Sequence, residues 1–199
     1  MRRKNFGLGA GIAIAILAFV SPALAQDLTI TNVRVVVTPD AVLNQGSIVV
    51  RGGRIVSIAP GVPPSITGTT IDGKGMTAIA GYIDGHRHVN TGPNEKAQMQ
   101  ALLDAGYTTI LSGGGPAEGN ITLRDHIDQG LIKGPRIIPT GRLNLQTSTP
   151  DQIRAEVRRF AALGIKFIGE QNLTPKPGPT AKEMENLRAA VDESKSAFS

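Results

Sequence analysis

Two of the three histidines in this sequence lie beside an aspartate, in the run Asp84-Gly-His86-Arg-His88. Alternate side chains of an extended strand share one face, so Asp84, His86 and His88 are predicted to point the same way. Neutral imidazoles are good ligands for Zn²⁺, Fe²⁺ or Mn²⁺, and two of them at i and i+2 can share one ion. A pair of ordinary surface or core histidines is the alternative. Their position together at a predicted strand end favours a divalent-metal site.

Residues 76–199 are predicted to form the elements that position these histidines. Strands are expected at 76–82, 107–112, 136–140 and 165–169, with helices at 94–104, 121–129, 150–163 and 180–194. Strand–helix repeats of this kind imply a parallel sheet with right-handed crossovers. The histidines would then project from the carboxyl end of the first strand, the face that carries the active site in α/β barrels. Four such units amount to half of a (β/α)₈ TIM barrel, so the predicted fold class is α/β with a partial barrel.

Residues 26–75 show a different pattern, without a helical period. Short alternating strands are expected at 28–31, 33–37, 47–51, 54–58 and 70–73, separated by Gly- and Pro-containing turns. A small antiparallel sheet or β-sandwich segment before the barrel is the expected arrangement.

Residues 1–25 are predicted to be a secretory signal peptide, cleaved after Ala25. A basic start at Arg2–Lys4 precedes an uncharged apolar run from Gly7 to Val20 and the small residues of Ala23-Leu-Ala25. A transmembrane anchor is the alternative, but a run of about 14 residues is short for the ~20 that a bilayer needs. The Arg2-Arg3 pair leaves a twin-arginine export signal open.

The composition narrows the possible functions. The 199 residues include no cysteine, which excludes a disulfide scaffold, a cysteine zinc site, an Fe–S cluster, a thiol nucleophile and a lipoprotein anchor. The formal charge of +5 includes three basic residues in the signal and no acidic ones, so the mature chain would carry +2. No basic run with interleaved aromatics remains, so no nucleic-acid partner is expected. We expect a periplasmic or secreted protein without a membrane segment after cleavage.

The run Ala80-Gly-Tyr-Ile-Asp84-Gly-His86-Arg-His88 resembles the first-strand motif of the amidohydrolase superfamily. That motif usually reads P-G-x-I-D-x-H-x-H, and Ala80 replaces its proline. Further stretches resemble the same family, in its imidazolonepropionase-, prolidase- or enamidase-like branches: 52–58, 71–75, 101–109, 123–128 and 134–142. The resemblance covers essentially the whole mature chain and implies a metal-dependent hydrolase.

The resemblance implies that His86 and His88 bind a divalent metal, with Zn²⁺ favoured and Fe²⁺ or Mn²⁺ as alternatives. Asp84 is expected to support the motif through hydrogen bonds rather than to ligate the metal. The third histidine, His126, falls in mid-helix and is expected to be a surface or interhelical residue.

The fourth strand of the family supplies a bridging ligand, either a carboxylated lysine or a glutamate. Glu170 at the strand's carboxyl end is favoured as this metal ligand over Lys166, which lies ~13 Å further down an extended strand. Lys166 and a merely solvated Glu170 stay open as alternatives. The Gly-rich stretch 112–115 is interpreted as a loop leaving the strand beside the site, and Arg142 as a contact for an anionic substrate or a structural partner.

The family takes two further histidine ligands and a catalytic aspartate from strands five, six and eight. After Glu170 this sequence has no histidine and one aspartate, Asp192, in a predicted helix. The resemblance therefore implies the N-terminal half of an exported amidohydrolase acting on a small amide-type substrate. The chain is expected to be inactive alone, with the general-base aspartate beyond its C-terminus and the oligomeric state left open. A split enzyme completed by a second chain and a non-catalytic binding protein are the alternatives.

Overall fold

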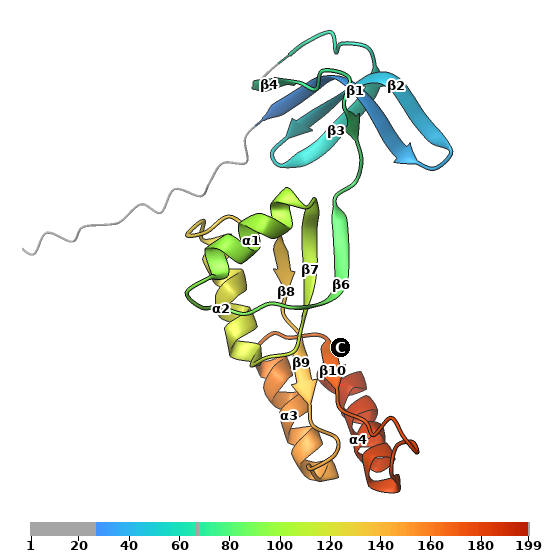
Figure 1. The fold of residues 1–199 in the computed structure, drawn as a ribbon, viewed down its shortest axis with the longest axis vertical. Coiled ribbons are helices and arrows are strands. Elements are labelled where there is room, and N and C mark those ends of the chain that lie inside the picture. Colours follow the sequence, from blue (N-terminus) through green and yellow to red (C-terminus); the bar gives the residue numbers. More distant parts are fainter. Residues whose placement is uncertain (1–26, 67, 199) are drawn as a thin grey trace, which may run out of the picture. The chain divides into compact units, whose positions relative to one another are not determined.

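The computed structural model describes residues 27–66 and 68–198, so the predicted signal peptide lies outside the described residues. The chain divides into two compact units between Ala80 and Gly81 (Figure 1), and each is described by itself. In the described part of the chain, no helix is long and apolar enough to cross a membrane.

The first unit is a five-stranded sheet. Its strands are β1 (Leu28–Thr38), β2 (Ala41–Arg51), β3 (Arg54–Pro60), β4 (Thr69–Asp72) and β5 (Thr77–Ala78). The order is β3-β2-β1-β4, and β5 also pairs with β1. The antiparallel prediction is confirmed for the first three strands and wrong for β4, which runs parallel to β1. The cause is the connection from β3 to β4, which crosses the sheet before β4 begins. The strand predicted at 76–82 is also wrong, because residues 77–78 form β5, which pairs with β1 in this sheet.

The β2–β3 hairpin follows from its turn residues. Gly52 and Gly53 have φ of 54° and 73°. Two successive positive φ angles match the turn that suits the twist of a two-residue hairpin, and glycine adopts them without strain. The core of this sheet contains Val33, Val35 and Ile48.

The second unit alternates strands and helices, as predicted. Its elements are β6 (Tyr82–His88), α1 (Glu95–Asp104), β7 (Tyr107–Gly113), α2 (Ala117–Asp128), β8 (Arg136–Ile138), β9 (Gly141–Leu143), α3 (Pro150–Ala162), β10 (Ile168–Gln171) and α4 (Ala181–Ala197). All its strand pairs are parallel: β6 with β7, β7 with β8, and β9 with β10. The unit is a mixed α/β domain whose described strands form open sheets and do not show a closed barrel.

The predicted third strand is divided into β8 and β9. Pro139, which has no N–H for a strand ladder, stands at the break. A buried polar link to the end of β7 spans the break: Thr140 donates its backbone N–H to Ser112 Oγ at 3.2 Å, and its hydroxyl donates to the Ser112 carbonyl. The Ser112 hydroxyl donates to the Ile138 carbonyl at 3.3 Å. The divided strand thus pairs with β7 through its first half and with β10 through its second.

The helices predicted at 150–163 and 180–194 begin at or within one residue of the expected positions. Thr149 and Thr180 each form a capping box with the residue three positions later, which satisfies free N–H groups of the first turn. At α1, Asn94 occupies the position before the first helical residue but makes no side-chain cap bond. The Glu95 carboxylate instead accepts hydrogen bonds from the Thr91 hydroxyl and the Gly92 N–H, at 2.6 and 3.2 Å. Three element starts also differ from the prediction. The histidine-bearing strand β6 begins six residues later, at Tyr82, α2 begins four residues earlier, and β10 begins three residues later.

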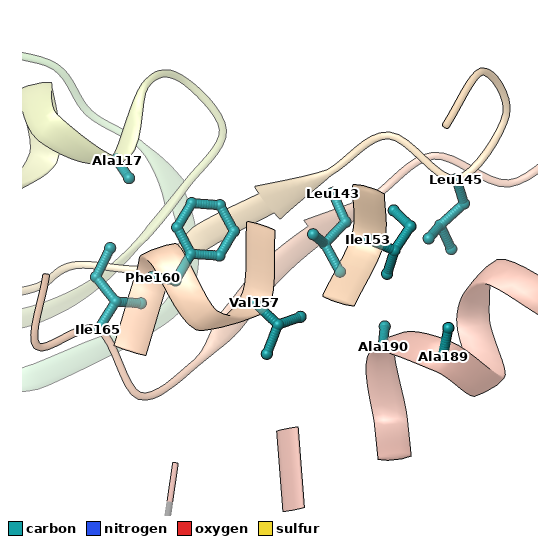
Figure 2. Close-up of a cluster of buried hydrophobic side chains, with 9 residues drawn as sticks. All are labelled: Ala117, Leu143, Leu145, Ile153, Val157, Phe160, Ile165, Ala189 and Ala190. Atoms are coloured by element: carbon teal, nitrogen blue, oxygen red, sulfur yellow. The ribbon is translucent and has the colours of Figure 1, made fainter. Parts of the chain in front are cut away.

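Two clusters of buried apolar side chains hold this unit together. The larger one joins α3 and α4 to β9 (Figure 2): Ala117, Leu143, Leu145, Ile153, Val157, Phe160, Ile165, Ala189 and Ala190. On α3, Ile153, Val157 and Phe160 follow the i, i+4, i+7 spacing of an inward helix face. The other cluster packs β6 to β8 against α1 and α2: Val89, Met99, Leu102, Ile110, Leu123 and Ile137.

Candidate metal centre

His86, His88 and Glu170 come together at the carboxyl ends of β6 and β10. One ligand atom from each of the three residues lies within 4.8 Å of the other two. His88 Nε2 is 3.3 Å from Glu170 Oε2, and the two imidazole rings stand 5.3 Å apart in an edge-on arrangement. We call these three residues the His–His–Glu group.

The carboxylate of Glu170 fits the position of a cation ligand. Its Oε2 atom is buried and accepts no hydrogen bond from the described residues. A buried carboxylate oxygen that accepts no hydrogen bond is costly, and a cation held between this atom and the neighbouring His88 Nε2 would offset that cost. Two ligand atoms about 2.1 Å from one tetrahedral ion lie about 3.4 Å apart, close to the separation of Oε2 from His88 Nε2. Two imidazoles and a carboxylate also form a donor set that suits Zn²⁺, Fe²⁺ or Mn²⁺.

Two glycines at the end of β7 allow the His–His–Glu group to form. A Cβ on Gly113 would lie 2.5 Å from His86 Cε1. A Cβ on Gly114 would lie 2.6 Å from His88 Cε1 and 2.8 Å from Glu170 Oε2. The imidazoles and the carboxylate therefore lie directly against the backbone of these residues, which we call the glycine cradle. Interpreting 112–115 as a simple exit loop missed this role, for which glycines directly after a strand were the only signal.

A bulge in β10 directs Glu170 toward the histidines. Ile168 pairs with Gly141, and Glu170 pairs with the next residue, Arg142, so two residues of β10 span one of β9. Gly169 lies between them, and a Cβ there would overlap the Thr140 hydroxyl. Ile168 packs against the α3–α4 core, whereas the Glu170 carboxylate lies beside the histidines. Strict alternation would place Ile168 and Glu170 on one face of the strand, and the bulge interrupts this alternation.

The alternative strand-four residue, Lys166, is not part of the group. It precedes β10 and is exposed, and it lines a cavity with Phe167 and Val191 of α4. Of the two residues weighed from the sequence, the structure brings Glu170 to the histidines.

Asp84 and Arg142 surround the group with hydrogen-bonding and charged atoms. Asp84 Oδ1 accepts the backbone N–H of His86 at 3.1 Å, so this carboxylate supports the strand end that carries the histidines. Arg142 Nε is 3.8 Å from Glu170 Oε1, and its Nη2 donates to Asn172 Oδ1 at 3.5 Å. Of the two roles left open for Arg142, the structure shows the pairing with a neighbouring carboxylate.

His126 lies away from this group, as expected. Its Nδ1 is 2.7 Å from Glu95 Oε1, which joins α2 to α1. Hydrogen bonds from Thr91 and then from His126 lower the pKa of Glu95, so the pair is an interhelical contact. The prediction of an interhelical histidine is confirmed.

Comparison with known proteins finds several chains with a similar sequence or a similar structure. No family model matches the sequence. An imidazolonepropionase of Saccharopolyspora erythraea is 28% identical over 155 residues, which cover 73% of this chain and 39% of the relative. A urease subunit alpha of Sulfurisphaera tokodaii is 35% identical over 127 residues, or 57% of this chain and 22% of the relative. The crystal structure of a Bifidobacterium longum protein assigned as a prolidase is 28% identical with a TM-score of 0.73, covering 86% of this chain and 47% of that one.

The fold and the site define an α/β chain with parallel strands and a candidate cation-binding group at their carboxyl ends. This chain belongs to the amidohydrolase superfamily, with prolidase, imidazolonepropionase and urease relatives. It spans about half the length of the solved structures it matches and a smaller share of the curated relatives. A Xaa-Pro dipeptidase structure with bound methionine shares the fold at 20% identity and a TM-score of 0.68.

Proposed function

We propose that this chain supplies one half of the metal centre of an amidohydrolase that hydrolyses a C–N bond in a small amide-type substrate. The observation that carries the proposal is the convergence of His86, His88 and the buried Oε2 atom of Glu170, which accepts no hydrogen bond from the described residues. Membership of the amidohydrolase superfamily supports a hydrolase acting on C–N bonds. An amide, a cyclic amide or a peptide-like bond fits this class.

The chain's own residues have separable roles in this proposal. His86 and His88 would hold the ion through neutral ring nitrogens and Glu170 through Oε2, with Zn²⁺ favoured and Fe²⁺ or Mn²⁺ as alternatives. A bound divalent ion supplies Lewis-acid activation of water and of a scissile carbonyl group. Asp84 holds the backbone of the His86 strand end, and Arg142 places a positive charge beside the second oxygen of Glu170.

We assign the general base and the remaining ligands to polypeptide outside the described residues. The one other histidine of the sequence, His126, is engaged by Glu95 in an interhelical contact. We therefore propose that the 199-residue chain is inactive alone, and that a longer reading frame or a partner chain completes the site. Assays of amide and peptide hydrolysis on the short chain and on an extended reading frame test this, and robust turnover by the short chain would refute it.

Metal titration of matched histidine variants tests the metal centre directly. We expect the purified chain to bind about one Zn²⁺ or Co²⁺ ion in calorimetric titration, and His88→Ala to lose this binding. His126→Ala is the matched control, because it removes the histidine that lies outside the group. Equal metal binding by His88→Ala and His126→Ala would contradict the proposed centre.

We also propose that the protein is exported, to the periplasm or the medium. The proposal rests on the signal-like pattern of residues 1–25 in the sequence. Cell fractionation and the mass of the exported chain test it, with Gln26 expected as the new N-terminus. A full-length cytoplasmic product would contradict it.

A further inference from the structure

Asn120 in α2 is a fully buried amide that contacts the glycine cradle. Its side chain is 0% exposed, and Nδ2 donates a hydrogen bond to the Gly114 carbonyl at 3.3 Å. Gly114 is the residue whose backbone lies against both His88 and Glu170. A single hydrogen bond therefore links the interior of α2 to the peptide on which two members of the His–His–Glu group rest.

The cradle needs such an external constraint. Gly114 and Gly115 both have positive φ, at 62° and 76°, in a segment between β7 and α2. Glycine gives a peptide segment more conformational freedom than any other residue, so its geometry must come from its partners. The hydrogen bond from the Asn120 amide constrains the Gly114 peptide from α2.

Packing alone does not account for an amide at this position. Asn120 Oδ1 is buried and has no hydrogen-bond partner among the described residues. A buried polar atom without a partner costs free energy, whereas an apolar side chain would bury no such oxygen. The contribution specific to asparagine here is the hydrogen bond from Nδ2 to the cradle.

We propose that Asn120 is a positioning residue of the metal centre, acting through the Gly114 carbonyl. This inference rests on the proposed function, because it assigns a role toward the metal that the His–His–Glu group would bind. Residues that orient metal ligands without touching the ion typically change affinity 10–100-fold when they are removed. Asn120 acts one step further out, so its loss should shift ligand geometry without removing a ligand.

A second buried asparagine provides a matched control. Asn186 in α4 is also 0% exposed, donates Nδ2 to the carbonyls of Leu145 and Ser148 at 2.9 Å, and has an unpaired Oδ1. It holds a loop that does not contact the His–His–Glu group in the described structure. Asn120→Ala and Asn186→Ala thus each remove a buried amide that donates to backbone carbonyl groups. Only the Asn120 amide contacts the glycine cradle.

The experiment is a Co²⁺ titration of the wild-type chain and both variants, followed by visible absorption, with circular dichroism to verify folding. We expect Asn120→Ala to bind Co²⁺ about tenfold more weakly, with an altered visible band that reports changed ligand geometry. Asn186→Ala should lose stability toward urea but keep the wild-type Co²⁺ affinity and spectrum. If Asn120→Ala does not fold, Asn120→Ser replaces it, because a serine hydroxyl can bond the carbonyl one helical turn back.

The outcomes separate this inference from the proposed function. Wild-type affinity and spectrum in a folded Asn120 variant overturn the positioning role while the metal centre stands. Equal loss of affinity in the Asn120 and Asn186 variants also overturns it, since general destabilisation would then explain the effect. A wild-type chain that binds no Co²⁺ refutes the metal centre itself, and the inference with it.

Discussion

Alanine in place of Gly114 should weaken metal binding in addition to straining the backbone. The added Cβ would lie 2.6 Å from His88 Cε1 and 2.8 Å from Glu170 Oε2. Carbon atoms in ordinary contact are separated by about 3.5 Å, so the imidazole must retreat by roughly 0.9 Å. Metal sites tolerate only about 0.2 Å of change in ligand distance, so a shift of this size removes His88 or Glu170 as an effective ligand.

Two further glycines separate the steric effect from backbone strain. Gly114 has φ of 62°, a left-handed conformation that costs about 1–2 kcal/mol for a residue with a Cβ. Gly130 has φ of 71° with no atom within 4 Å of its added Cβ, so Gly130→Ala carries the strain without the clash. Gly113→Ala carries the clash, with His86, and its backbone lies outside the left-handed region. Metal affinity should therefore fall in the Gly113 and Gly114 variants and stay unchanged in the Gly130 variant.

Urea unfolding in EDTA gives the free energy of unfolding without metal. The same measurement with Zn²⁺ gives the additional stabilisation by metal binding. At a free Zn²⁺ concentration of 100 times the wild-type Kd, binding should stabilise the wild-type chain by about 2.7 kcal/mol. A tenfold loss of affinity would reduce this gain to about 1.4 kcal/mol in Gly114→Ala. The reasoning is refuted if Gly114→Ala retains the full Zn²⁺-dependent gain, or if Gly130→Ala loses it to the same extent.

Two predictions concern the α3–α4 region. Hydrogen bonds from the Thr180 backbone and then from Thr174 lower the pKa of Glu183 to about 2, against 4.5 for the free group. The stability that Glu183 contributes is thus present above about pH 4.5 and lost as the pH falls toward 2. Urea unfolding should show a shallower acid loss for Glu183→Gln than for the wild type, and parallel pH profiles would contradict this origin. The α3 residue Phe160 is 1% exposed in the core cluster that also contains Leu143 of β9. Phe160→Ala should lower the free energy of unfolding by about 3–5 kcal/mol. A loss below about 1 kcal/mol would contradict the place of Phe160 in the core.

The sequence predicts most reliably where the structure depends on neighbours along the chain. The starts of the helices at 150 and 180 follow from local spacing, and the structure shows capping boxes there, at Thr149 and Thr180. The expectation of a surface or interhelical position for His126 is also confirmed, by its contact between α2 and α1. The parallel direction of the strands can also be predicted from the sequence, because alternating strands and helices favour crossover connections between parallel strands. The glycine cradle does not follow, since its role depends on imidazoles that arrive from another strand. The division of the third strand likewise depends on Thr140 finding Ser112 on β7.

The orientation of Glu170 shows why a strand-end residue cannot be placed by alternation alone. Counting by twos from Ile168 puts Glu170 on the same face, yet Ile168 packs into the core and Glu170 faces the histidines. The difference arises at Gly169, whose missing Cβ lets β10 bulge against the Thr140 hydroxyl. Thr140 is in turn positioned by its hydrogen bonds to Ser112 at the end of β7. The direction of one carboxylate is therefore set by the junction of three strands, because the polar link beneath the site determines where the bulge can form.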